Sequence, residues 1–170
     1  MSAILTNQNA NSYTGDHMQR LLLSLFVLVI VSTSSAYAAT PLTAESFNLD
    51  QYKGKVVYLD FWASWCGPCK FSFPYMEQQS YLYRDKDFVI ITVNLDKSNE
   101  KAQAFLRDVN TKLPVIFDPN GVLAEKYAVK DMPTSILFDR TGKLRTVHQG
   151  FFRNKEREYT AHILELLNEK

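Results

Sequence analysis

The sequence has little cysteine and no excess of charge of either sign. Cys66 and Cys69 are its two cysteines, so the chain cannot carry a framework of several disulfides. Its 19 basic and 18 acidic residues leave a formal net charge of +1. Because so small a charge creates no broad electrostatic field, we expect no nucleic-acid partner and no electrostatic attraction to membranes. Any partner must therefore be recognised through local contacts at a particular site.

The sequence also lacks an apolar run long enough to be an obvious membrane span. The run at 21–31 is shorter than the roughly 20 residues that cross a bilayer. It follows Arg20 and precedes the small residues Ala36 and Ala38, which is the layout of a secretory signal peptide. We expect a signal peptide at 1–38, cleaved after Ala38, with Met18 as a possible true start. The mature protein would then be periplasmic or otherwise exported without stable membrane insertion, and membrane-tethered if uncleaved.

The chain has the composition of a soluble globular protein, and we expect one domain at residues 39–170. Hydrophobic residues make up 46% of the chain and aromatic residues 13%, which is enough apolar mass for a core. β-Rich apolar runs alternate with segments of helical periodicity, and Pro74 is expected to kink the first helix. This order predicts an α/β fold with a mixed central sheet flanked by helices. The expected strands are 56–62, 88–95, 113–117, 134–139 and 144–150, and the expected helices are 68–83, 101–109, 122–127 and 155–167.

The cysteines are separated by two residues at the start of a predicted helix. Such a pair can close a small disulfide ring and reopen it. A helix N-terminus favours the thiolate, and in such motifs the pKa of the first thiol falls from about 8.5 to between roughly 3.5 and 7.5. We therefore predict Cys66 as the nucleophile and Cys69 as the resolving thiol of a redox-active disulfide.

Three other interpretations of the pair remain open at this point. A zinc half-site needs two further ligands, but His148 and His162 are not spaced as a ligand pair, so no metal and no other cofactor is expected. A permanent structural disulfide would close a loop too small to constrain the unfolded chain much. The pair could also be the remnant of catalysis on a binding module.

The segment 60–70, DFWASWCGPCK, resembles the active-site segment of thioredoxins. Pro74 matches their helix-kinking proline, Met132-Pro133-Thr134 their cis-proline loop, and Gly150 the glycine near the substrate groove. The resemblance covers residues 42–170. The extra strand and helix at 113–127 are similar to the insertion of the TlpA/ResA-like family, whose members are exported thiol-disulfide reductases. The resemblance implies a three-layer thioredoxin-like fold with a TlpA-type strand-helix insertion.

The same resemblance implies roles for residues around the cysteines. Pro133 would be cis beside Cys66, so that the Met132 backbone pairs with a substrate strand; an ordinary trans turn is the alternative. Asp60 would be buried and exchange a proton with Cys69, although it could merely end a strand near water. Thr92 stands where thioredoxins often carry a lysine that partners this acid, so proton handling is expected to differ. Trp65, Gly67, Pro68 and Gly150 are the remaining expected substrate-binding residues.

Two further side chains are ambiguous in the sequence. Trp62 could wall the thiols or pack in the core, and we favour packing. His148 lies two residues before Gly150, so it could contact substrate or tune Cys66, although histidines in strands are commonly exposed or simply hydrogen-bonded.

The function that follows is reduction of protein disulfides by the CGPC dithiol, with re-reduction by a membrane electron donor of the DsbD type. Gly67 and Pro68 favour the reducing direction by resemblance to thioredoxins. The alternatives are an oxidase or isomerase of the same fold, and a non-catalytic module that holds a client protein.

Overall fold

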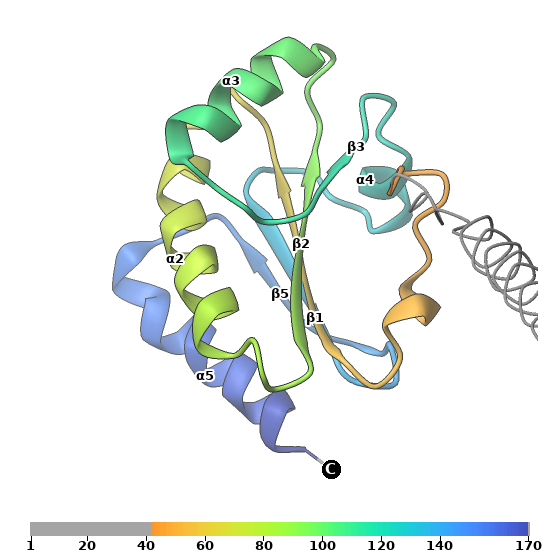
Figure 1. Ribbon diagram of the computed structural model, residues 1–170, viewed down its shortest axis with the longest axis vertical. Coiled ribbons are helices and arrows are strands. Elements are labelled where there is room, and N and C mark those ends of the chain that lie inside the picture. The colour runs from red at the N-terminus through yellow and green to blue at the C-terminus, as the bar shows by residue number, and fades with distance from the viewer. Residues whose placement is uncertain (1–41, 170) are drawn as a thin grey trace, which may run out of the picture. The chain divides into compact units, whose positions relative to one another are not determined.

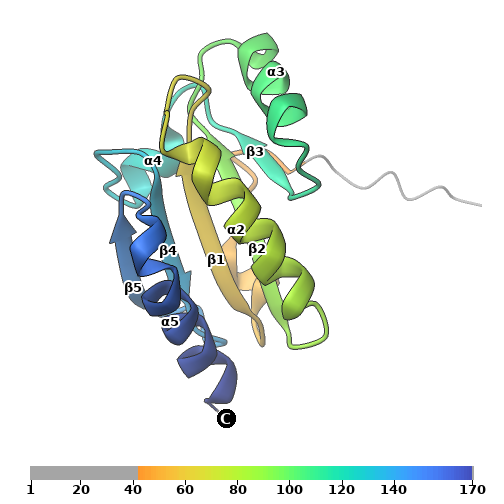
Figure 2. The same ribbon diagram turned by 90° about the vertical axis from the view of Figure 1, so that its left-hand side faces the viewer.

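The computed structural model describes residues 42–169, which belong to one compact unit built on a five-stranded mixed sheet. The strand order is β3-β2-β1-β4-β5, which Figure 2 shows across the sheet, whereas Figure 1 views the sheet nearly edge-on. β1 and β3 run parallel to β2, whereas β4 pairs antiparallel with both β1 and β5. The mixed sheet predicted from the sequence is confirmed. The strands are β1 (Val56–Trp62), β2 (Phe88–Asn94), β3 (Val115–Phe117), β4 (Thr134–Phe138) and β5 (Leu144–Gln149).

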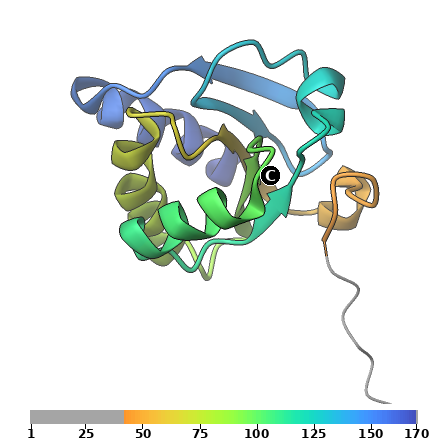
Figure 3. The ribbon, with the colours of Figure 1, turned by 90° about the horizontal axis from the view of Figure 1, so that it is seen from above.

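Helices cover both faces of the sheet, which gives the three layers expected of a thioredoxin-like fold (Figures 2 and 3). Three helices pack in the core on one face, and the segment before β1 packs with a short helix on the other. The first group comprises α2 (Cys69–Leu82), α3 (Asn99–Val109) and α5 (Glu156–Asn168), and the second comprises η2 (Leu49–Tyr52) and α4 (Val122–Lys126). A short η3 (Arg153–Lys155) leads into α5.

The central strand β1 explains why the two faces form separate cores. All seven of its residues are buried, and successive side chains of a strand point to opposite faces. Tyr58 and Trp62 therefore pack with the cysteines under α2 and α5, whereas Leu59 and Phe61 pack under η2 and α4. A strand buried on both faces reads as a continuous apolar run, and this made β1 visible in the sequence.

Element boundaries shift slightly from the expected ranges. The helix predicted from residue 101 begins at Asn99 because the Ser98 side chain caps it, accepting a hydrogen bond from the Lys101 amide. η2 and η3 were not predicted. In the expected insertion at 113–127, β3 extends the sheet beside β2, and α4 covers the face opposite α2.

The signal peptide predicted at 1–38 lies outside the described residues. Among residues 42–169, none of the helices is both long and apolar enough to cross a membrane.

Candidate active site

Cys66 and Cys69 lie where β1 gives way to α2, and they form a disulfide with their Cα atoms 5.4 Å apart. Cys69 is fully buried, and Cys66 retains 4% exposure. The Cys69 amide donates a 3.3 Å hydrogen bond to Cys66 Sγ. Free amides at a helix start stabilise negative charge. Cys66 is thus the more accessible of the two sulfurs and lies beside amides at a helix start, whereas Cys69 is shielded behind it.

The loop that carries the motif is anchored to the end of β2 by Asp96. Its carboxylate accepts hydrogen bonds from the Ser64 amide at 2.9 Å, the Ser64 hydroxyl at 2.8 Å and the Asn94 side-chain amide at 2.7 Å. Asp96 is not among the site residues predicted from the sequence. Its role could have been found from the topology, because the carboxyl ends of neighbouring parallel strands meet at one edge of a sheet.

Asp60 is completely buried in β1, on the face of the sheet that carries the cysteines. Ser135 of β4 donates a 2.6 Å hydrogen bond to Asp60 Oδ1, and the Tyr58 hydroxyl donates a 2.8 Å bond to Ser135 Oγ. Asp60 Oδ2 has no hydrogen-bond partner among the described residues. Burial raises the pKa of Asp60 to about 7, although the bond from Ser135 acts in the opposite direction. Asp60 is therefore placed to gain and lose a proton near neutral pH.

Thr92 is the neighbour of Asp60 across the β1–β2 pair. Its side chain is neutral, and its hydroxyl donates to the Pro114 carbonyl at 3.0 Å. The register therefore places a neutral side chain beside Asp60. Burial is the dominant influence on the pKa of Asp60.

The Met132–Pro133 peptide bond is cis, as predicted. Met132 packs against the core cluster that contains both cysteines, and Pro133 is buried. The Gly150 amide donates a 2.7 Å hydrogen bond to the Pro133 carbonyl. Gly150 has a φ of +77°, and a Cβ at this position would lie 3.0 Å from the Phe152 ring. The fold therefore requires glycine where it ties the cis-proline loop to the end of β5.

The other motif residues divide into exposed and buried groups. Gly67 and Pro68 are exposed, and Trp65 is 69% exposed. Trp62 is fully buried and packs against Phe73 and Phe105, with ring centroids 5.2 Å and 4.7 Å away. Trp62 is accordingly a core residue, whereas Trp65 offers an apolar surface beside the thiols.

His148 was ambiguous in the sequence, and the structure places it inside the protein. It is buried against α5, where its Nε2 lies 2.9 Å from Nδ1 of His162 and its ring lies 4.6 Å from that of Tyr159. Burial and the neighbouring His162 lower its pKa to about 4. The two histidines are not spaced as a ligand pair in the sequence, but the fold brings their rings into contact. Within residues 42–169, no group of three or more potential metal ligands converges.

The fold and this site define a thioredoxin-like protein with a redox-type cysteine pair. The family model for Redoxin matches residues 29–163. The chain belongs to the Redoxin family.

Named relatives and solved structures agree with this assignment. The thioredoxin-like protein YneN of Bacillus subtilis is 34% identical over 125 residues, or 72% of each chain. The thiol-disulfide oxidoreductase ResA of Bacillus thuringiensis is 34% identical over 108 residues, which cover 64% of this chain. The match spans only 62% of that ResA. A structure described as a thiol:disulfide interchange protein DsbE from Chlorobium tepidum shares 46% identity, with a TM-score of 0.69, over 71% of this chain and 85% of its own.

Proposed function

We propose that this chain is an exported thiol-disulfide oxidoreductase that reduces protein disulfides through Cys66 and Cys69. The observation that carries the proposal is the placement of the pair at the start of α2, on the same face of the sheet as the buried Asp60. The relatives ResA and DsbE carry names of the same chemistry. The cis-proline loop beside the pair supplies a backbone edge for a client strand.

The reaction begins when the Cys66 thiolate attacks one sulfur of a client disulfide. The client S–S bond breaks, a mixed disulfide forms on Cys66, and one client thiolate leaves and takes up a proton. Deprotonated Cys69 then attacks Cys66 Sγ and breaks the mixed disulfide, which releases the second client thiolate. The client gains two electrons and the protein is left with the Cys66–Cys69 disulfide.

Asp60 serves the second step as the base that accepts the Cys69 proton. Its pKa of about 7 allows it to be ionised in a useful fraction of molecules near neutral pH. Asp60 shares its face of β1 with Tyr58 and Trp62, which pack in one cluster with Cys69. With neutral Thr92 beside it, the carboxyl is a stronger proton acceptor than one paired with a cation.

The proposed direction is reductive because Gly67 and Pro68 separate the cysteines, as in thioredoxins of low potential. An exported reductase needs electrons from outside its compartment, and a membrane donor of the DsbD type would supply them. Export itself rests on the signal-peptide pattern at 1–38.

A trapping experiment tests the enzymatic proposal. The Cys69→Ser protein lacks the resolving thiol, so it should retain a client as a mixed disulfide on Cys66. That complex should disappear under dithiothreitol and be absent from the Cys66→Ser control. If no covalent client is recovered and the Cys66→Ser protein supports full function in cells, the chain is a non-catalytic client-binding module instead.

A further inference from the structure

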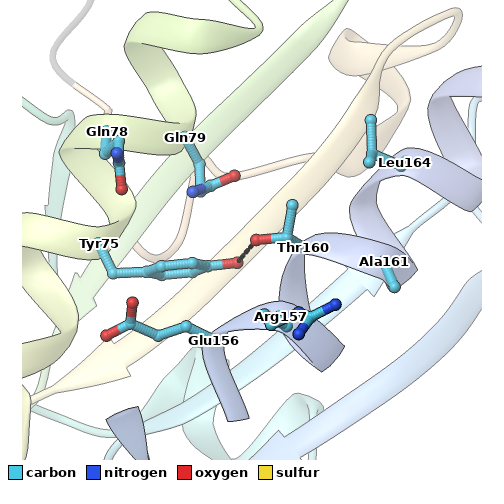
Figure 4. Close-up of a pocket in the computed structure, with 8 residues that line it drawn as sticks. All are labelled: Tyr75, Gln78, Gln79, Glu156, Arg157, Thr160, Ala161 and Leu164. Atoms are coloured by element: carbon cyan, nitrogen blue, oxygen red, sulfur yellow. Dashed lines mark hydrogen bonds between the residues drawn. The ribbon is translucent and has the colours of Figure 1, made fainter. Parts of the chain in front are cut away.

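A surface groove of about 350 Å³ runs between α2 and α5. In Figure 4, Tyr75 and Gln79 of α2 extend toward Thr160 of α5, and the Tyr75 hydroxyl lies 3.2 Å from Thr160 Oγ1. Leu164, which is 39% exposed, lines the groove one turn further along α5. The walls therefore combine apolar, hydrogen-bonding and charged groups, the last being Glu156 and Arg157.

A second groove of about 260 Å³ adjoins the first and shares Tyr75 and two other lining residues with it. It is lined by Phe71 and Arg153 as well. Phe71 lies in the first turn of α2, two residues after Cys69. The two grooves thus form one depression that leads from the redox end of α2 along both helices, and we call it the α2–α5 groove.

Gln79 gives this groove an unsatisfied acceptor. The side chain is only 3% exposed, and its Oε1 has no hydrogen-bond partner among the described residues. Buried polar atoms in native proteins nearly always have a partner. An N–H donor on a molecule seated in the groove would complete the hydrogen bonding of Gln79.

Arg153 gives the other end of the groove an available positive charge. Its guanidinium lies 4.6 Å from the centre of the Phe71 ring, and it takes part in none of the ion pairs formed within residues 42–169. Phe71 itself is 52% exposed. Glu156 also lines both grooves, but it forms no ion pair with Arg153 within residues 42–169. A guanidinium held on an aromatic ring and free of an acidic partner is suited to a carboxylate.

From these features we infer that the α2–α5 groove binds an extended segment of the client polypeptide, with an acidic residue near the reactive cysteine and an apolar residue further along. This inference rests on the proposed function, because the attack by Cys66 brings a client chain to the redox end of α2. The carboxylate pairs with Arg153, a peptide N–H donates to Gln79, and the apolar side chain packs on Leu164.

The helix geometry sets the spacing of the two recognised residues. Phe71 marks the Arg153 end of the groove, and Gln79 lines the part that contains Leu164. Phe71 and Gln79 are eight positions apart on α2, which corresponds to about 12 Å at the usual rise per residue. An extended chain covers that distance in about four residues. The client segment should therefore carry its acidic and apolar side chains about four positions apart.

Synthetic peptides test this specificity. Each peptide carries one cysteine in a disulfide with thionitrobenzoate, and the reduced protein releases this chromophore. One peptide has Asp beside the cysteine and Leu four positions later, and the second has Lys and Ser at these places. Each rate is divided by the rate with the thionitrobenzoate disulfide of cysteine methyl ester. Because this reference carries no peptide segment, any effect of a substitution on the reactivity of the Cys66–Cys69 dithiol cancels in the ratio.

We expect the Asp/Leu peptide to react about tenfold faster than the Lys/Ser peptide, the effect of one or two contributing side chains. The Leu164→Glu protein should lose the part of this preference that depends on Leu, and Arg153→Glu should reverse the part that depends on Asp. Leu82→Glu places the same charge at an exposed leucine of α2 that does not line the groove, and should leave the preference intact.

The inference is overturned if wild-type protein reacts equally with both peptides, or if Leu164→Glu and Leu82→Glu behave alike. It is also overturned if sedimentation shows a dimer that Leu164→Glu dissociates, because the groove would then bind a second copy. Failure of wild-type protein to react even with the methyl ester would instead contradict the proposed function.

Discussion

Ser135 donates a 2.6 Å hydrogen bond to Asp60 across the antiparallel pair of β4 and β1. Ser135 follows the cis-Pro133 by two residues, so this bond joins the cis-proline loop to the buried carboxyl beneath the redox helix. The hydroxyl also stabilises the ionised form of Asp60 in an environment that otherwise opposes it. The acid of the site is therefore tuned by burial and one hydrogen bond, without a neighbouring cation.

Replacing Asp60 with Asn should slow the resolution step. General acid–base groups contribute roughly 100-fold or more to rate, so we expect a loss of about that size above pH 7. The rate of oxidation of the reduced protein by a client disulfide, followed by tryptophan fluorescence, should lose its inflection near pH 7. The exposed-site control Asp85→Asn should keep the wild-type profile, and an unchanged inflection in Asp60→Asn would rule out Asp60 as the base.

The same carboxyl should make stability depend on pH. Its folded-state pKa of about 7 exceeds the usual 3.8, so between these values the folded protein binds more protons than the unfolded chain. Stability should therefore be full near pH 4 and fall as the pH rises to 7, by at most about 4 kcal/mol for this group. The free energy of unfolding can be measured in urea for Asp60→Asn and wild type. The difference, variant minus wild type, should be more positive at pH 8 than at pH 4.5. If the free energies of unfolding of the two proteins changed with pH in the same way, Asp60 would not be desolvated.

Removal of the Ser135 hydroxyl should raise the pKa of Asp60 further, because the bond from Ser135 lowers it. The inflection in the pH–rate profile of Ser135→Ala should move above that of wild type. The variant should also lose about 1–3 kcal/mol of stability, since the buried Tyr58 hydroxyl loses its acceptor. Ser135→Thr retains a hydroxyl and should restore the inflection. A shift in the opposite direction would contradict the assigned role of this bond.

Gly150→Ala should both destabilise the protein and impair its reaction with protein disulfides. The residue has a positive φ, and an added Cβ would lie 3.0 Å from the Phe152 ring, which would have to shift, so a loss of about 1–3 kcal/mol is expected. Gly142→Ala is a matched control, because Gly142 has a φ of +84° and lies away from the cysteines in the β4–β5 turn. Both variants should unfold at lower urea concentration, but only Gly150→Ala should react more slowly with a folded client. If Gly150→Ala and Gly142→Ala reacted with the folded client at equal rates, Gly150 would not be a substrate-binding residue.

Much of the fold could be predicted because β1, β2 and β4 are short, largely apolar runs that are buried on both faces. β1 was predicted from such a run. The position of Cys66 and Cys69 between a predicted strand and a predicted helix indicated the redox chemistry. Ser135 was missed because its importance depends on strand register. Tyr58 and Asp60 reach it across 77 and 75 residues of sequence, and no local pattern encodes such a pairing.

The histidines illustrate the same limit. His148 and His162 lie on β5 and α5, and only the packing of that helix on the sheet brings their ring nitrogens within 2.9 Å. The orientation of His148 toward α5 was likewise set by the face of β5 on which it falls. Sequence spacing indicated neither relationship.

The reduction potential of the Cys66–Cys69 couple tests the central claim most directly. The oxidised and reduced fractions can be measured after equilibration in dithiothreitol and glutathione buffers, by mass spectrometry of alkylated protein. A reductase should give a value near −270 mV, as thioredoxins do, and a value near −120 mV, as for the oxidant DsbA, would contradict the proposed direction.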